Sequence, residues 1–275
     1  MYEGKLLWHF DHRFASYDLK GVVKGKGGRG LPETPIEKSQ DPSWHITPQY
    51  WVRADEVETR LGSSATNGWL LALRDITSAK LERTCVASIL PLSGTDYTVR
   101  VMVLSQSAHM QLVLLGNLNS LPFDYFARQK LAGTHLSDYI TFQLPVLPPS
   151  FYQAADVAYV GSRVLELVYT ADDMQPLSDA LRAAASPLAA TVPRAPYRWD
   201  EARRALLRAE LDAWYARAYG LTRDELRYIL DPADVHGPDF PGETFRVLKE
   251  KETAKFGEYR TRRLVLEAWD KLPHS

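Results

Sequence analysis

The order of hydrophobic and polar positions in the first half of the chain predicts several strands and one long helical stretch. Leucines recur at steps of three and four residues between positions 110 and 132, which predicts a helix. Because proline has no amide hydrogen to donate, Pro122 should kink this helix or begin a second one. Runs rich in β-branched and aromatic residues predict four strands, at residues 68–75, 84–90, 97–104 and 139–147.

After residue 150 the pattern is that of helices. Residues 198–219 have apolar side chains on one side and charged side chains on the other, and Gly220 is suited to end this helix in a left-handed conformation. A capping box formed by Thr222 and Glu225 predicts the start of a short helix that stops before the next proline. Residues 257–272 predict the last helix.

A proline-rich run at residues 144–149 separates the two patterns, and we place the domain boundary there. We predict an α+β fold, with a mixed-sheet domain of residues 1–150 followed by an all-helical domain of residues 151–275. No apolar run approaches the roughly 20 residues that span a bilayer. The N-terminus lacks the layout of a secretory signal. We therefore expect a cytoplasmic protein with no membrane contact.

The formal net charge of −1 argues against a DNA-binding protein with basic groups over its whole surface. A local basic site remains compatible with it, because residues 20–30 contain four cations and no acid. A phosphate-binding P-loop does not fit, since Lys26 is followed by two glycines and no helix can start before Pro32. Two interpretations stay open: a solvated loop, or a loop in which Lys24, Lys26 and Arg29 contact DNA phosphates.

Three short motifs are similar to catalytic or metal-binding sites, and each departs from the pattern that its chemistry needs. Asp41-Pro42-Ser43-Trp44 lacks the second proline and the preceding strand of an adenine methyltransferase loop, so we interpret it as a turn. His9-Phe10-Asp11-His12 has a metal-ligand spacing without a third ligand nearby, which favours a hydrogen-bonding role. Asp239 with Glu250-Lys251 lacks the final triplet of a nuclease site. We therefore expect no catalytic residue, metal or cofactor on this chain, and a core position for its single cysteine, Cys85.

Polar side chains that can bond DNA bases and phosphates are concentrated in residues 116–136. Arg, Lys, Gln and Asn are the side chains that pair with base edges and phosphates. We predict DNA contacts from Asn117, Asn119, Ser120, Arg128, Gln129, Lys130, Gly133, Thr134 and His135. The alternative is a structural role, in which Arg128 and Lys130 pair with Asp124 or Asp138.

Short motifs of a known family occur in order along nearly the whole chain. Those in and after the polar segment are Asn119-Ser120, Phe123-Asp124-Tyr125, Ala127-Arg128-Gln129-Lys130, Gly133-Thr134-His135-Leu136 and Gln143-Leu144-Pro145-Val146-Leu147-Pro148-Pro149. The others are Tyr2-Glu3-Gly4-Lys5, Phe10-Asp11-His12-Arg13, Tyr50-Trp51-Val52, Arg74-Asp75-Ile76-Thr77 and Phe240-Pro241-Gly242-Glu243-Thr244-Phe245. Together they resemble the specificity region of type IIG-like restriction–modification adenine methyltransferases, which have a TaqI-like specificity domain.

The resemblance implies a chain that grips duplex DNA, selects the sequence and presents the target adenine for flipping. It adds Arg74 to the expected DNA contacts. It also implies a methyltransferase domain, with or without a nuclease domain, N-terminal to this region, and S-adenosylmethionine as the cofactor of the intact enzyme. Two alternatives remain from the residues themselves: a helical protein-interaction subunit of a phage-defence complex, docking through residues 198–219, and an unrecognised nuclease.

Overall fold

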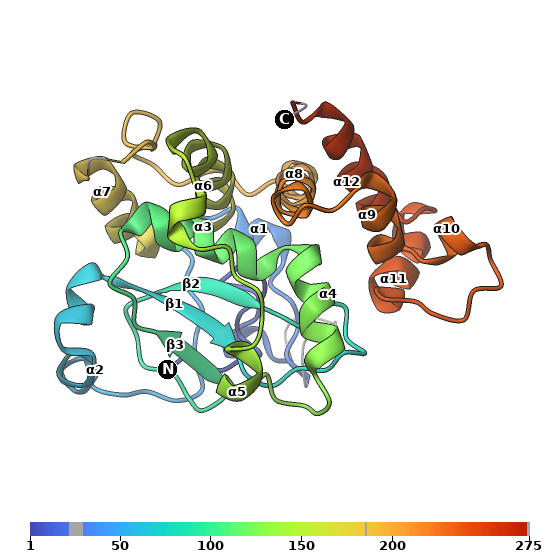
Figure 1. Ribbon diagram of the computed structural model, residues 1–275. Coiled ribbons are helices and arrows are strands. Elements are labelled where there is room, and N and C mark those ends of the chain that lie inside the picture. Colours follow the sequence, from blue (N-terminus) through green and yellow to red (C-terminus); the bar gives the residue numbers. More distant parts are fainter. Residues whose placement is uncertain (22–29, 185, 274–275) are drawn as a thin grey trace. The chain divides into compact units, whose positions relative to one another are not determined.

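A computed structural model describes residues 1–21, 30–184 and 186–273 of the chain (Figure 1). The chain divides into two compact units, and each unit is assembled from three separate segments. Unit 1 comprises Met1–Ile76, Val86–Gly116 and Pro148–Asp200, and unit 2 comprises Thr77–Cys85, Asn117–Leu147 and Glu201–Ser275. The chain passes from unit 2 to unit 1 close to the predicted boundary at residue 150. The two units are nevertheless not the contiguous domains 1–150 and 151–275 that the sequence pattern predicts.

Unit 1 is built on a small antiparallel sheet, which confirms the α+β class. Its strands are β1 (Trp69–Arg74), β2 (Ala87–Pro91) and β3 (Val99–Met102), in the order β2-β1-β3. Both neighbours pair antiparallel with β1. The predicted mixed sheet is therefore wrong for the described residues, because short connections join all three strands and no crossover helix intervenes.

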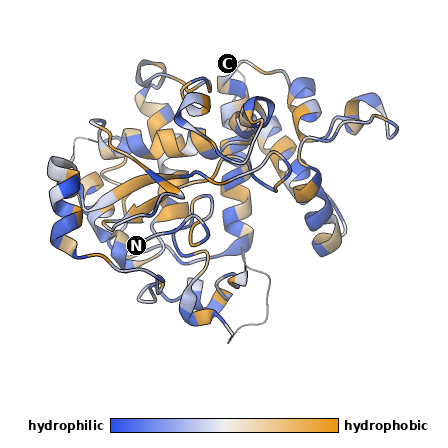
Figure 2. Ribbon diagram, turned by 90° about the horizontal axis from the view of Figure 1, so that it is seen from below, coloured by the Kyte–Doolittle hydropathy of each residue, from blue (hydrophilic) through white to orange (hydrophobic). Residues whose placement is uncertain are grey.

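Both faces of the central strand are covered, which explains why it reads as a continuous apolar run. Leu70 and Ala72 pack with the N-terminal residues Tyr2 and Leu6 in one buried cluster. On the opposite face, the indole Nε1 of Trp69 donates a 3.0 Å hydrogen bond to Gln111 of α3 (Ala108–Asn119). Seen from below, most of the strand surface is coloured as hydrophobic (Figure 2).

The remaining elements of unit 1 are short helices around this sheet. They are η1 (Tyr17–Leu19), α1 (Ile36–Ser39), α2 (Ala54–Leu61), η3 (Gly62–Asn67), η4 (Pro149–Phe151), α6 (Ala154–Val168), η5 (Asp172–Met174) and α7 (Gln175–Ala183). Helix α2 has no buried residue and is mainly hydrophilic in Figure 2, whereas α6 buries an apolar face. Considering only the described residues, no helix is both long and apolar enough to cross a membrane.

The regular elements of unit 2 in its described residues are all helices, joined by irregular segments such as residues 77–85. Its helices are α4 (Leu121–Lys130), α5 (Asp138–Thr141), α8 (Glu201–Ala218), α9 (Arg223–Leu230), α10 (Ala233–His236), α11 (Arg246–Phe256) and α12 (Arg260–Lys271). Helix α8 packs against α4 and α12, and α9 packs against the same two helices. The predicted ends are confirmed: Gly220 adopts a φ of 77°, and Thr222 and Glu225 form a capping box.

Two predictions around the polar segment have opposite outcomes. The expected interruption at Pro122 is confirmed, because α3 ends at Asn119 and α4 begins at Leu121. The strand predicted for residues 139–147 is wrong: α5 is followed by irregular chain up to Pro149. Prolines in this stretch have no amide hydrogen for a sheet, and the ring of Phe142 is 84% exposed rather than packed.

Candidate nucleic-acid interface

The start of α4 is held by polar side chains that the sequence pattern assigned to DNA. The Ser120 hydroxyl caps the helix by accepting a hydrogen bond from the amide of Phe123. Asp212 of α8 accepts a 2.7 Å hydrogen bond from the amide of Leu121. Burial raises the pKa of Asp212 to about 6. These contacts satisfy amide groups that the first turn of a helix cannot satisfy by itself.

Asn117 is completely buried and joins three parts of unit 2. Its amide group donates a 2.6 Å hydrogen bond to the hydroxyl of Tyr219 and accepts one of 3.1 Å from the amide of Leu147. The Tyr219 hydroxyl in turn donates to the carbonyl of Pro145. This network ties the chain after α5 to the end of α8.

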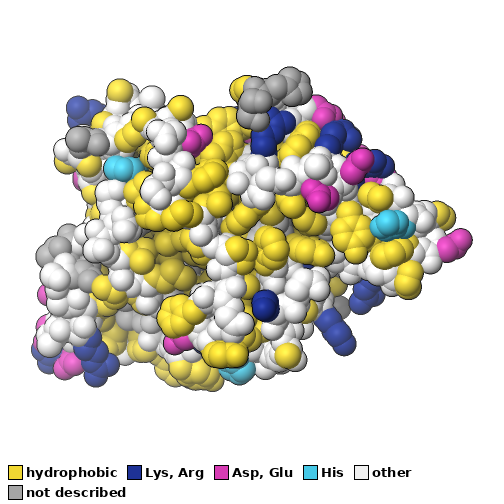
Figure 3. Space-filling model, viewed as in Figure 1, with side chains coloured by type: hydrophobic (Ala, Val, Ile, Leu, Met, Phe, Trp, Pro, Cys, Tyr) yellow, Lys and Arg dark blue, Asp and Glu magenta, His cyan; other side chains and the backbone are white. Residues whose placement is uncertain are grey.

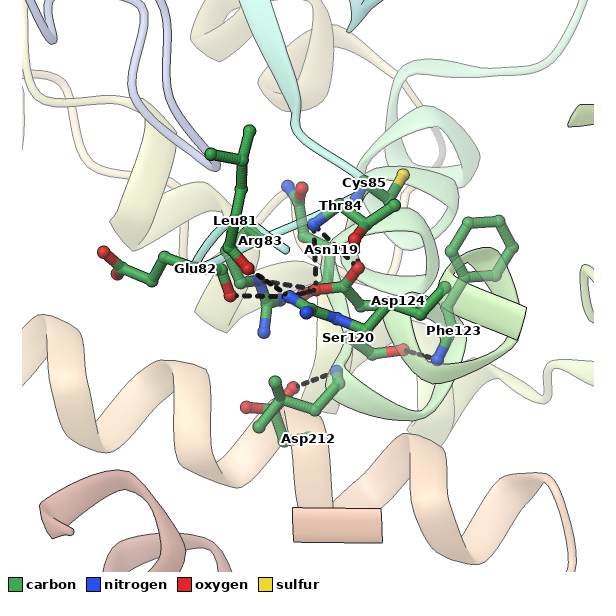
Figure 4. A network of polar contacts seen from close by, with 12 residues as sticks. Leu81, Glu82, Arg83, Thr84, Cys85, Asn119, Ser120, Phe123, Asp124 and Asp212 are labelled. Carbon is green, nitrogen blue, oxygen red and sulfur yellow. Dashed lines mark hydrogen bonds and ion pairs between the residues drawn. The ribbon is translucent and has the colours of Figure 1, made fainter. Parts of the chain in front are cut away.

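Asp124 lies at the centre of the polar network in Figure 4 and is completely buried. Its carboxylate accepts hydrogen bonds from the amides of Thr84 and Cys85, at 2.9 and 3.1 Å. The guanidinium groups of Arg83 and Arg128 lie within 3.6 and 3.5 Å of the same carboxylate. A buried charge is tolerated inside a protein when it is both hydrogen-bonded and paired with an opposite charge, and the Asp124 carboxylate has contacts of both kinds.

Arg128 uses its guanidinium to hold loops of unit 2 against α4. Its terminal nitrogens donate to the carbonyls of Ala79, Leu81, Glu82 and Thr244, at 2.7 to 3.0 Å. The guanidinium also lies over the ring of Phe245, 4.6 Å from its centre. Burial lowers the pKa of Arg128, although Asp124 opposes this effect.

Four of the predicted DNA contacts are therefore assigned to the interior instead. Asn117, Asn119 and Ser120 are at most 1% exposed, and Arg128 is 9% exposed. The Asn119 carbonyl accepts a hydrogen bond from Arg83. Since the side chains of Asn117, Ser120 and Arg128 already form hydrogen bonds within the chain, a base edge would have to displace those bonds. These contacts favour the structural alternative, in which Arg128 pairs with Asp124.

The second half of the polar segment is exposed. Gln129 and Lys130 end α4 and point outward, and Gly133, Thr134 and His135 follow in the exposed turn. The Thr134 carbonyl accepts a 3.0 Å hydrogen bond from the amide of Thr77, so the turn is tied to the loop that Arg128 holds. We call these five residues the α4 turn.

One residue near the α4 turn has no signal in the sequence pattern. Lys80 is exposed and lies between Ala79 and Leu81, whose carbonyls both accept hydrogen bonds from Arg128. The contacts of Arg128 place Lys80 beside the C-terminal end of α4, although 50 residues separate it from Lys130 in the chain. Within the described residues neither lysine ammonium has an ion-pair partner.

The other predicted contacts lie elsewhere. Arg74, in unit 1, is half-buried; its Nε donates to the carbonyl of Ile76, and its guanidinium lies over the ring of Trp8. Lys24, Lys26 and Arg29 lie outside the described residues. Figure 3 shows one face on which the drawn Lys and Arg side chains are scattered among hydrophobic ones without forming a continuous basic patch.

The motifs that departed from catalytic patterns have structural contacts. The Asp41 carboxylate accepts hydrogen bonds from the amide and hydroxyl of Ser43, which makes the predicted turn. His12 hydrogen-bonds Asp173, as expected of a structural histidine. Glu250 pairs with Arg246 of its own helix. Among residues 1–21, 30–184 and 186–273 no group of three or more His, Cys, Asp or Glu is arranged to hold a metal.

Cys85 confirms its predicted place in the core, where it is completely buried. Burial and the nearby carboxylate of Asp124 raise the pKa of its thiol.

Comparison of the chain with protein-family models, with curated proteins and with solved structures yields no match.

Proposed function

We propose that this chain is the DNA-recognition portion of a restriction–modification adenine-specific DNA methyltransferase. In this role it binds duplex DNA and positions the target adenine for a methyltransferase domain that uses S-adenosylmethionine. The observation that carries the proposal is the α4 turn: Gln129, Lys130, Thr134 and His135 are exposed together at the end of a helix. The motif resemblance supplies the family.

The chemistry of the α4 turn suits the major groove. A glutamine can pair with adenine through two hydrogen bonds, a threonine can bond to several bases, and a lysine can contact guanine or phosphate. Gly133 has no side chain, so its backbone can approach a phosphate closely. We assign base contacts to Gln129, Thr134 and His135.

Lys80 and Lys130 extend this assignment to the DNA backbone. Two exposed ammonium groups on adjoining segments can contact successive phosphates and release condensed counterions. Their positions are fixed by the buried contacts of Arg128 and Asp124, so both cations would be presented without a large loss of backbone freedom.

Fluorescence anisotropy with a mixed-sequence duplex tests the phosphate contacts. Binding of the full chain should weaken with added NaCl, and the double variant K80A/K130A should reduce the slope of log Kd against log salt by about 2. The control is Lys271→Ala, which removes one ammonium group from an exposed position on α12 and should leave the slope unchanged. The proposal is contradicted if the chain does not bind the duplex at 50 mM NaCl, or if its affinity does not fall as NaCl is added. It is also contradicted if K271A changes the slope as much as K80A/K130A does.

Gln129 provides the test of sequence reading. The recognised sequence can be found by mapping methylated adenines in a host that carries the intact gene. On that sequence Q129A should lose about 1–3 kcal/mol of discrimination against a single changed base pair, whereas K130A should weaken binding to all duplexes alike. A uniform loss in Q129A would reassign the residue to the backbone.

A protein-interaction role has one observation in its favour. The rings of Tyr139 and Phe142 on and after α5 are 79% and 84% exposed. Exposed aromatic side chains are enriched in protein interfaces. If Y139A/F142A removed all interactions of the chain with a co-purified subunit and left DNA affinity unchanged, α5 and Phe142 would be assigned to a protein interface.

A further inference from the structure

Unit 1 contains a cavity that the proposed function does not use. Its volume is about 310 Å³, at the lower end of the range found for small-molecule sites. Apolar side chains form most of the wall, among them Ile46, Val52, Val57 and Leu92. The described residues that line it include two carboxylates, Asp173 and Glu58, no Lys or Arg, and Met1, whose N-terminal ammonium donates a 2.7 Å hydrogen bond to the carbonyl of Tyr50.

Asp173 is the polar group held most firmly at this cavity. Its side chain is 19% exposed, and its Oδ1 lies 3.0 Å from Nε2 of His12, a ring that is itself 2% exposed. Burial acts to raise the pKa of Asp173, but His12, His45 and Arg13 outweigh it and lower the pKa below its ordinary value. The group is therefore a carboxylate at neutral pH. Its Oδ1 contacts His12, and its Oδ2 can accept a hydrogen bond from a ligand.

The wall that carries His45 and Ile46 is fixed by a buried arginine. Arg13 is 1% exposed, and its terminal nitrogens donate to four backbone carbonyls at 2.8 to 2.9 Å. Three of these carbonyls lie between Ser39 and Trp44, and the fourth belongs to Thr170. This arrangement fixes the chain before His45 against the segment that leads to Asp173, so the cavity is built before any ligand arrives.

An aromatic ring lies at the edge of the cavity. Trp51 lines it and is nevertheless 77% exposed, so its ring is accessible to a bound molecule. The face of a tryptophan attracts cations, and an apolar wall attracts hydrocarbon. A ligand group in direct contact with the carboxylates of Asp173 and Glu58 is disfavoured when it is itself a phosphate or a carboxylate.

We propose that this cavity binds a small organic cation, with an ammonium or guanidinium group on an apolar or aromatic body. The cationic group would donate hydrogen bonds to Asp173 and lie near Glu58, while the body packs on Ile46, Val52 and Leu92. The inference stands apart from DNA binding, because it concerns unit 1 and a ligand of opposite charge to DNA.

Three probes of similar shape and different charge test the proposal on the full chain by ligand-detected NMR titration. Phenethylamine is the cation, 2-phenylethanol is neutral and 3-phenylpropionate is the anion. We expect phenethylamine to bind with a Kd of about 0.1–1 mM, the alcohol to bind at least fivefold more weakly, and the anion not to bind. Equal binding of the anion, or no binding of phenethylamine at 10 mM, overturns the proposal.

Asp173→Asn should weaken phenethylamine binding at least tenfold. Its matched control is Asp172→Asn, which removes the same charge from the exposed neighbour and should bind as the unaltered chain does. Equal Kd values for the two variants overturn the assignment. If loss of the His12 partner unfolds D173N, Val57→Trp serves instead, because it keeps both His12 and Asp173 and adds a large ring to the cavity wall. Binding that persists in a folded V57W contradicts the site.

Discussion

Residues 117–128 and residues 129–135 are two halves of one polar segment, and they use similar side chains in different ways. In the first half, Asn117 and Arg128 donate to the Tyr219 hydroxyl and to backbone carbonyls inside unit 2. In the second half, Gln129 and Lys130 are exposed. The comparison shows that a run of DNA-compatible residue types can be divided between a support and the surface that it supports.

The division has a physical reason in the geometry of α4. One face of this helix packs against α8 and α9, so polar residues on that face must find partners inside the protein. The last turn of the helix emerges from this packing, and its side chains can reach solvent. A one-residue step from Arg128 to Gln129 rotates the side chain by about 100°, which is enough to separate interior from surface.

Arg128→Ala should have the largest effect on this comparison. Removing a buried guanidinium leaves four carbonyls without this donor and takes away one of the two cations beside the buried Asp124, so the free energy of unfolding should fall by about 3–5 kcal/mol. Urea unfolding followed by circular dichroism measures this change. Lys130→Ala, two positions away and exposed, should change stability by less than about 0.5 kcal/mol. Similar losses in both variants would mean that the two halves are not distinct.

Asp212→Asn should change how the free energy of unfolding depends on pH, because Asp212 is a buried carboxyl group at the start of α4. Because the folded pKa of Asp212, about 6, exceeds its ordinary value of 3.8, the unfolded chain releases this proton first as pH rises. The contribution of Asp212 to stability therefore falls between pH 4 and pH 7, by about 3 kcal/mol at most. An asparagine can still accept from the Leu121 amide and does not titrate.

The stability of D212N relative to the unaltered chain should thus increase from pH 4 to pH 7. Thermal unfolding of both proteins at matched pH values measures the difference, which cancels the titration of the other carboxyl groups. A difference that is constant with pH would show that Asp212 titrates normally in the folded protein.

Ser120→Ala should have the smallest effect of the three. The hydroxyl caps α4 through the amide of Phe123, and loss of such a cap costs about 1 kcal/mol. Ser120→Thr retains the capping hydroxyl without adding a charge and serves as the control. If S120A left both stability and DNA affinity unchanged, the capping bond would not contribute to holding the α4 turn.

Much of the fold follows from local pattern. The three strands of the sheet, the break before Pro122, the end of α8 at Gly220 and the capping box at Thr222 are all signalled by neighbouring residues. Such features depend on side-chain periodicity, on proline's missing amide hydrogen and on glycine's tolerance of positive φ, which act within a few residues.

The errors share a cause in contacts between distant segments. The run at residues 139–147 has strand-like composition, but no neighbouring strand pairs with it among the described residues, and prolines limit its donors. Residues 77–85 belong to unit 2 because they contact Arg128 and Asp124, which are far along the chain, and no local pattern signals this grouping. Lys80 has no motif around it, and only those contacts bring it to the α4 turn.

The sequence by itself determined which side chains could form hydrogen bonds or ion pairs with DNA. It also determined where the helices around these residues begin and end. Tertiary structure decided which of those residues are available, because burial against α8, α9 and the 77–85 loop uses the donors of Asn117 and Arg128 internally. Exposure is a property of the packed chain, so residue type alone cannot separate the support of the α4 turn from its surface.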